Sequence, residues 1–170
     1  MRGEQPRAQH FLRSDLARRL VARSGVRSGD LVFDLGAGAG ALTFPLAGVA
    51  GRVVAVERDA RLARRLAARA PANVSVYEQS IEATWFPARR PFRVVANLPF
   101  AGSSAVVRRL LGERRLLGAD VIVELGVALK WQSDRPDRCS VVTALPADAF
   151  VPPPSCRAAV LRLSPPGGRR

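Results

Sequence analysis

A hydrophobic run that ends in closely spaced glycines constrains the fold of this chain more than any other feature. Residues 31–35 read LVFDL and continue directly into the glycine turn 36–40, GAGAG. The apolar run is typical of a buried strand, and residues 41–46 predict the start of a helix. Glycines suit the turn because a side chain would block both the tight bend and the approach of a ligand to the backbone.

Further apolar, β-branched runs alternate with stretches of helical period, such as Ser14–Ser24 and the segment that Asp59 can cap. This alternation is typical of strands joined by crossover helices. We therefore predict an α/β fold with a mostly parallel seven-stranded sheet and helices on both faces. The predicted strands are Leu31–Asp34, Arg52–Val56, Val74–Tyr77, Arg93–Ala96, Val121–Glu124, Ser140–Leu145 and Ala158–Leu163.

The charge of the chain points to a polyanionic partner. Its 170 residues include 27 Lys and Arg but only 14 Asp and Glu, which gives a net charge of +13. A field of that sign raises the local concentration of nucleic acid around the protein. For any single arginine, a solvated helix face is the simpler interpretation, so the prediction depends on the summed charge.

Other chemistries find little support in the sequence. Cys139 and Cys156 are far apart and form no CxxC pair, so we expect no bound metal and no disulfide. No uninterrupted apolar stretch approaches the roughly 18 residues that cross a bilayer, and the N-terminus lacks the apolar core of a signal peptide. We therefore expect a cytoplasmic monomer of one domain with no membrane partner.

An acidic residue follows the glycine turn at a spacing that is typical of nucleotide-binding folds. Glu57 ends the next predicted strand, 21 residues after Gly36, which is the offset at which an acid commonly accepts hydrogen bonds from ribose hydroxyls. The amides at the helix start suit an anion such as a carboxylate. An adenosine-containing cofactor is indicated. Gly36, Gly38 and Ala41 also satisfy the dinucleotide pattern, so a nicotinamide enzyme stays open.

The tetrapeptide Asn97, Leu98, Pro99, Phe100 follows the fourth predicted strand, at the sheet edge where such folds bind ligands. The Asn97 side-chain oxygen and the Leu98 carbonyl can accept the two hydrogens of an exocyclic amine on adenine, which localises its lone pair for methyl transfer. Pro99 fixes the backbone, and Phe100 can stack on a base turned out of its helix. In isolation the tetrapeptide is more simply explained as a strand-ending turn, and it is the glycine turn and the acid before it that favour the catalytic interpretation.

Four motifs in order make the sequence resemble the ribosomal RNA adenine dimethyltransferases, which include the macrolide-resistance enzymes. These are QHFL at 9–12, FDLGAGAG at 33–40, NLPF at 97–100 and FVPPP at 150–154. The resemblance implies a Rossmann-like class I fold, S-adenosylmethionine as cofactor, and N6-methylation of adenine in 23S ribosomal RNA, free of protein, that confers macrolide-lincosamide-streptogramin resistance. We expect the cofactor to be lined by His10, Leu12, Gly36, Gly38, Glu57, Ser80 and Asn97.

The chain also departs from the pattern of that family. His10 stands in place of Asn, and Ser80 in place of an Asp that accepts a hydrogen bond from the cofactor's adenine; we expect Ser80 to cost on the order of 1 kcal/mol in affinity. Because the mechanism needs no neutral-pH base, we expect His10 to pack or to position the backbone. Trp131, in the segment ELGVALKW, is expected to be a partly buried anchor.

The expected domain organisation is a catalytic domain over residues 1–163, with a basic N-terminal segment, and a flexible Pro- and Gly-rich tail over 164–170. We expect the helical C-terminal domain usual in the family to be absent. Two alternatives to an active ribosomal RNA methyltransferase stay open, the first because of these departures and the second because Asn-Pro-containing tetrapeptides also serve other amines. One is a catalytically weak RNA-binding member, and the other is a methyltransferase that acts on a small molecule or a protein amide.

Overall fold

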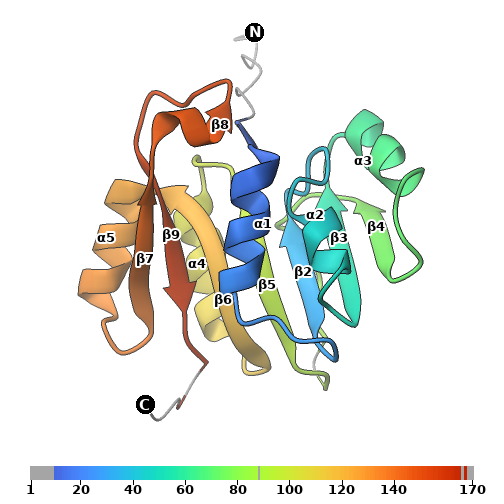
Figure 1. The fold of residues 1–170 in the computed structure, drawn as a ribbon. Helices are drawn as coiled ribbons and strands as arrows, with labels where there is room; N and C mark the ends of the chain where they lie inside the picture. Colours follow the sequence, from blue (N-terminus) through green and yellow to red (C-terminus); the bar gives the residue numbers. More distant parts are fainter. Residues whose placement is uncertain (1–9, 88, 166, 168–170) are drawn as a thin grey trace, which may run out of the picture.

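A seven-stranded sheet forms the centre of the computed structural model, which describes residues 10–87, 89–165 and 167 (Figure 1). The strand order is β4-β3-β2-β5-β6-β9-β7, and β9 runs antiparallel to both its neighbours while the other pairs are parallel. The strands are β2 (Leu31–Leu35), β3 (Arg52–Glu57), β4 (Val74–Glu78), β5 (Phe92–Asn97), β6 (Leu116–Glu124), β7 (Cys139–Leu145) and β9 (Ala158–Leu163).

Helices cover both faces of the sheet (Figure 1), because the central strands carry apolar side chains on alternate sides. Val95 and Ile122 pack in one cluster with residues of α1 and α2, whereas Val94 and Val121 pack in another with residues of α4 and α5. The helices are α1 (Ser14–Arg23), α2 (Thr43–Ala47), α3 (Ala60–Ala67), α4 (Ser103–Gly112) and α5 (Leu125–Asp134). The predicted α/β architecture is confirmed.

All seven predicted strands are present, and the differences lie at their ends. β6 begins at Leu116, five residues before its predicted start at 121, because Gly118 and Asp120 are poor indicators of a strand when burial is unknown. The helix after the glycine turn begins at Thr43, where 41 was predicted. The Asp59 carboxylate does cap α3, accepting hydrogen bonds from the amides of residues 61 and 62.

A second, two-stranded sheet was not predicted. β1 (Phe11–Leu12) pairs antiparallel with β8 (Phe150–Val151), which follows a short 3₁₀ helix, η1 (Ala147–Ala149). This pairing brings together segments about 140 residues apart in the chain and places them at one end of the main sheet (Figure 1). Two-residue strands leave almost no periodic signal in a sequence, so only the tertiary structure reveals them.

The ends of the chain are only partly described. The predicted basic N-terminal segment up to residue 9, and residues 166 and 168–170 of the predicted tail, lie outside the described residues. The tail begins as an ordered connection, because the Ser164 amide donates to Arg138 O at 2.8 Å and Ser164 O accepts from Arg138 Nε at 2.9 Å. Within the described ranges, no helix combines the length and apolar character needed to cross a bilayer.

Stability should depend strongly on β9, since this strand joins β6 to β7 in the middle of the antiparallel part of the sheet. Leu161 is fully buried there (0% exposed), whereas Leu129 on α5 is 50% exposed. We expect Leu161→Ala to lower the free energy of unfolding by about 2–5 kcal/mol because it leaves a cavity. Leu129→Ala should change it by about 0.5 kcal/mol or less. Equal losses in urea denaturation would contradict this placement of β9.

Candidate active site

The glycine turn and the NLPF tetrapeptide meet at the carboxyl edge of β2 and β5. Gly36 has φ +76°, a conformation that favours glycine. A Cβ placed on it would lie 3.6 Å from the carbonyl oxygen of Asn97 and 3.8 Å from Pro99 Cδ. Two motifs that are 61 residues apart in the sequence are therefore in van der Waals range. The structure brings the predicted cofactor turn and the predicted catalytic residues to one place.

Asn97 is half-buried and its amide has a defined orientation. The side-chain Nδ2 donates a hydrogen bond of 2.9 Å to the carbonyl oxygen of His10. A carbonyl oxygen only accepts, so this contact requires the amide nitrogen to face His10 and leaves Oδ1 to face another partner. No described residue donates to Oδ1 or to Leu98 O. Two acceptors on adjacent residues are thus available at the sheet edge.

His10 connects three parts of this edge. Its backbone oxygen binds Asn97, its Nδ1 donates to Pro152 O at 2.9 Å, and its ring stacks on Phe100 with a centroid separation of 5.9 Å and an interplanar angle of 27°. Phe100 in turn meets Phe150 edge to face at 6.4 Å. Since Pro152 O is an acceptor, Nδ1 must carry the proton. The structure assigns His10 the backbone-positioning role that was expected for it.

Glu57 is buried at the end of β3 and organises the glycine turn. Its Oε2 accepts from the Gly38 amide and its Oε1 from the Asp59 amide, each at 2.8 Å. The amides of Gly36 and Ala37 donate to Val56 O. The end of β3 therefore already satisfies the amides of Gly36, Ala37 and Gly38, and the prediction that amides at the start of the following helix receive an anion stays a prediction.

The hydrophobic residues of β1 occupy different environments because successive side chains of a strand point to opposite sides. Phe11 lies against the glycine turn, where a Cβ on Gly38 would be 3.2 Å from its ring. Leu12 is buried in the cluster that contains Phe150. The Leu12 side chain is therefore part of the core, and the predicted contact of Leu12 with the cofactor stays a prediction.

Ser80 lies in the loop after β4, and an arginine that sequence reasoning missed holds that loop. The Ser80 hydroxyl accepts from the Ala83 amide at 3.2 Å. The Arg109 guanidinium donates to Ile81 O at 3.0 Å, to Glu82 O at 3.2 Å and to Thr84 O. It also lies 4.8 Å from the centre of the Phe86 ring. One charged side chain from α4 therefore fixes the loop that carries Ser80. No pattern in the sequence around Arg109 or around this loop predicts the contact.

Trp131 is the partly buried anchor that was expected. It packs against the core cluster between the sheet and α4, and its Nε1 donates to Ser104 Oγ at 3.0 Å. Its indole nitrogen is thus engaged within the protein. Base stacking at this position finds no support in the structure.

A buried carboxyl group beneath the glycine turn also escaped prediction. Asp34 is 1% exposed, and its Oδ2 accepts a hydrogen bond of 2.6 Å from the Thr43 hydroxyl. The pKa of this carboxyl is raised from 3.8 to about 7, chiefly by burial; the hydrogen bond from Thr43 opposes the shift, and the negative charge of Glu57 adds to it. Asp34 therefore changes charge near neutral pH, directly below the residues that form the turn.

The stability of the protein should consequently depend on pH through Asp34. The native state keeps the proton up to about pH 7 and the unfolded chain releases it near 3.8, so ionisation of Asp34 costs stability as the pH rises between these values. Asp34→Asn, which stays neutral, should gain stability relative to wild type over that interval, by up to about 1.4 kcal/mol per pH unit. The gain should level off above pH 7. Urea denaturation at a series of pH values measures it, and a gain independent of pH would contradict the assignment.

Comparisons with known proteins agree with this architecture. A model of the family described as ribosomal RNA adenine dimethylase matches residues 5–168. A probable ribosomal RNA small subunit methyltransferase A from Pyrobaculum aerophilum is 35% identical over 93% of this chain and 73% of its own length. An rRNA adenine N-6-methyltransferase from Bacillus licheniformis is 29% identical over 96% of this chain and 63% of its own length.

Among solved structures, the 23S rRNA methyltransferase ErmE superposes with a TM-score of 0.83 at 25% identity, over 92% of this chain and 70% of that chain. The chain thus spans between about 60% and 75% of the length of these proteins. The likeness extends over the whole sheet and its helices. The chain belongs to the ribosomal RNA adenine dimethylase family of S-adenosylmethionine-dependent methyltransferases, as its four motifs indicated.

Proposed function

We propose that this protein methylates the exocyclic N6 of adenine in ribosomal RNA with S-adenosylmethionine as the methyl donor. The observation that carries the proposal is the orientation of Asn97 beside the glycine turn. Its Nδ2 is held by His10 O, which leaves Oδ1 as an acceptor, and its backbone lies 3.6 Å from the position of a Cβ on Gly36. Family membership supports the same reaction.

Asn97 Oδ1 and Leu98 O would accept the two hydrogens of the target amine. These bonds draw electron density toward nitrogen and orient its lone pair toward the methyl donor, so that positioning and electrostatics lower the barrier. Pro99, the residue after them, limits the backbone conformation there and lies exposed at the edge. Phe100, braced by His10 and Phe150, offers a ring face or edge to a base turned out of its helix.

The residues at the edge fit the cofactor. S-adenosylmethionine supplies a methyl group on a sulfonium, and Gly36 leaves room for it beside the backbone, because a Cβ there would meet nothing closer than 3.6 Å; the ring of Phe11 covers Gly38. Glu57 and Ser80 would receive its ribose and adenine; each oxygen that already binds an amide can accept a second hydrogen bond. His10, which directly precedes β1, and Leu12 within β1 would also contact the cofactor, Leu12 through its backbone.

The finer proposal concerns the substrate. We propose 23S ribosomal RNA, free of protein, as the target of a monomer whose catalytic domain covers 1–163, with macrolide-lincosamide-streptogramin resistance as the outcome. The TM-score of 0.83 with a 23S rRNA methyltransferase supports this. The small-subunit RNA is the second candidate, because a relative at 35% identity bears that name. Primer extension on both RNAs, after incubation with the protein and cofactor, distinguishes them: a stop confined to the small-subunit RNA would overturn the finer proposal.

Asn97→Ala tests the reaction itself. We expect the transfer of labelled methyl groups to protein-free ribosomal RNA to fall by about 100-fold or more, because the variant loses an acceptor aimed at the reacting amine. Asn73→Ala is the matched control: Asn73 donates to Ala47 O and Ala50 O, away from the edge, so its loss should lower thermal stability but leave the transfer rate of the folded protein. Wild-type protein that transfers no label while binding RNA and cofactor would instead identify a catalytically inactive RNA-binding member.

His10 variants test the brace around Asn97. His10→Ala loses the bond to Pro152 O and the stack on Phe100, and we expect kcat to fall by about tenfold through misplacement of Asn97 and Phe100. His10→Asn can still donate to Pro152 O, so it should recover part of that loss. A purely structural role would lower stability in both variants without moving kcat at temperatures where they are folded.

A further inference from the structure

A polar cavity of about 250 Å³ lies at the edge of the sheet opposite the glycine turn. It opens where α1 ends and where β5 and β6 begin, and β9 closes it as that strand leaves the sheet. Its lining includes the charged residues Arg23, Arg93, Asp120 and Arg162, together with Gly118 and Ser164. None of them belongs to the proposed catalytic edge.

The alternation of side chains along the strands explains why charge gathers there. Val95, Ile122 and Val160 face α1 in one hydrophobic cluster. Two positions nearer this edge of the sheet, earlier in β5 and β6 and later in the antiparallel β9, the residues share that face but lie beyond the end of the helix. They are Arg93, Asp120 and Arg162, in three neighbouring strands. The sheet face thus changes from apolar to charged where α1 stops covering it.

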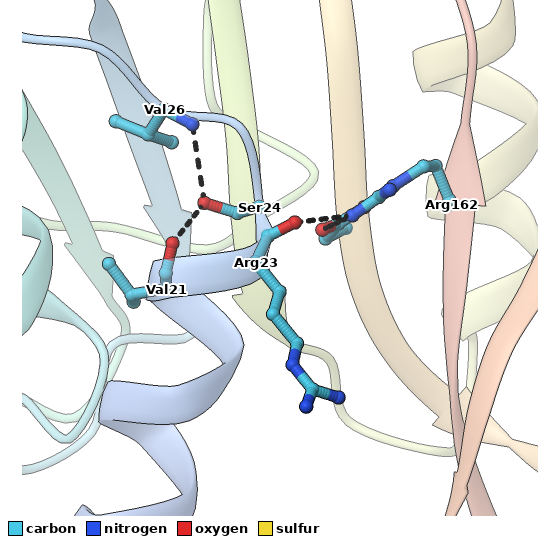
Figure 2. Close-up of polar contacts among 6 residues, drawn as sticks. Val21, Arg23, Ser24, Val26 and Arg162 are labelled. Carbon is cyan, nitrogen blue, oxygen red and sulfur yellow. Dashed lines mark hydrogen bonds and ion pairs between the residues drawn. The ribbon is translucent and has the colours of Figure 1, made fainter.

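The two strand arginines are held in place by carboxylates. Arg162 Nε and Nη2 bind Asp120 at 2.7 Å each, and Nη2 also donates to Arg23 O at 2.8 Å, which ties β9 to the end of α1 (Figure 2). The bond to Asp120 raises the pKa of Arg162 above its ordinary value. Arg93 Nε binds Asp30 at 2.8 Å. Both guanidinium groups are therefore fixed before any ligand arrives.

The end of α1 is fixed as well, but the Arg23 side chain is not. Ser24 Oγ donates to Val21 O at 2.7 Å and accepts from the Val26 amide, which closes the helix (Figure 2). The Arg23 side chain is exposed, and its guanidinium makes no hydrogen bond or ion pair with a described residue. Figure 2 shows it pointing away from the guanidinium of Arg162.

Donors exceed acceptors in this cavity. Its lining carries three guanidinium groups and one carboxylate, Asp120. Arg162 Nη1 and both terminal nitrogens of Arg93 make no hydrogen bond to a described residue, and Gly118 leaves the floor without a side chain, with Arg93 Nη1 3.3 Å from where a Cβ would lie. Fixed guanidinium forks with free N–H groups match the oxygens of a phosphate, which can accept from more than one of them at once.

We propose that this cavity binds a phosphate group, with Arg93 and Arg162 as fixed donors and Arg23 closing over it. The phosphate comes either from an RNA backbone or from a free phosphate ion. The site is independent of the catalytic proposal, because it shares no residue with the glycine turn or the tetrapeptide. If RNA supplies the phosphate, the cavity gives the substrate a second contact at the far end of the sheet.

The first experiment titrates the purified full chain with inorganic phosphate, at an ionic strength kept constant with chloride, and follows binding by calorimetry and thermal stability. Arg23→Gln should weaken phosphate binding by about fivefold to tenfold because it removes one charge-assisted contact. Arg19→Gln is the matched control, since Arg19 is an exposed arginine of the same helix that does not line the cavity. It should leave phosphate binding unchanged.

A double variant, Arg162→Gln with Asp120→Asn, replaces the fixed ion pair by two amides and should abolish phosphate binding where it remains folded. The source of the phosphate follows from competition. If RNA occupies the cavity, saturating inorganic phosphate weakens the binding of RNA to wild type but not to the folded double variant; if RNA binding is indifferent to phosphate, the ligand is the free ion. The proposal is overturned if phosphate binds no better than chloride, or if Arg23→Gln and Arg19→Gln respond alike.

Discussion

The candidate site depends on the close approach of two backbones at the carboxyl edge of the sheet. Gly36 can lie against Asn97 and Pro99 only because it has no side chain and because β2 and β5 are adjacent and parallel. Adjacent parallel strands end at the same edge, so the residues that follow them meet although they are far apart in the chain. Every functional assignment made for the glycine turn and the tetrapeptide relies on this geometry.

A second constraint comes from the pairing of β1 with β8. It holds His10 where its carbonyl oxygen orients the Asn97 amide and its ring supports Phe100. The amide could otherwise present either its nitrogen or its oxygen to a substrate, and only the oxygen can accept a hydrogen from an amine. A contact between two short, distant segments thus sets the chemistry that the tetrapeptide can perform.

Some of the arginines of this protein bind backbone carbonyl oxygens within the fold and are engaged before any partner arrives. Arg109 binds three carbonyl oxygens in the loop that carries Ser80, and Arg138 binds Leu111 O and Ser164 O. These side chains stabilise loops and strand ends, as guanidinium groups with five donors can. The net charge of +13 still attracts polyanions, but the number of arginines overstates how many face a partner.

The sequence by itself determined the α/β class, all seven strands of the main sheet, the glycine turn, Glu57 at the end of β3 and the tetrapeptide after β5. These features are local: each follows from side-chain periodicity or from residue types that a tight turn requires. The tertiary structure alone decided which side chains are buried and which donors and acceptors are already engaged in hydrogen bonds. It showed that Glu57 already holds two amides, that Leu12 is buried while Phe11 meets Gly38, and that Asp34, Arg109 and the cavity at Arg162 exist. Burial and contacts between segments that fold together create these properties, and side-chain periodicity along the sequence does not reveal them.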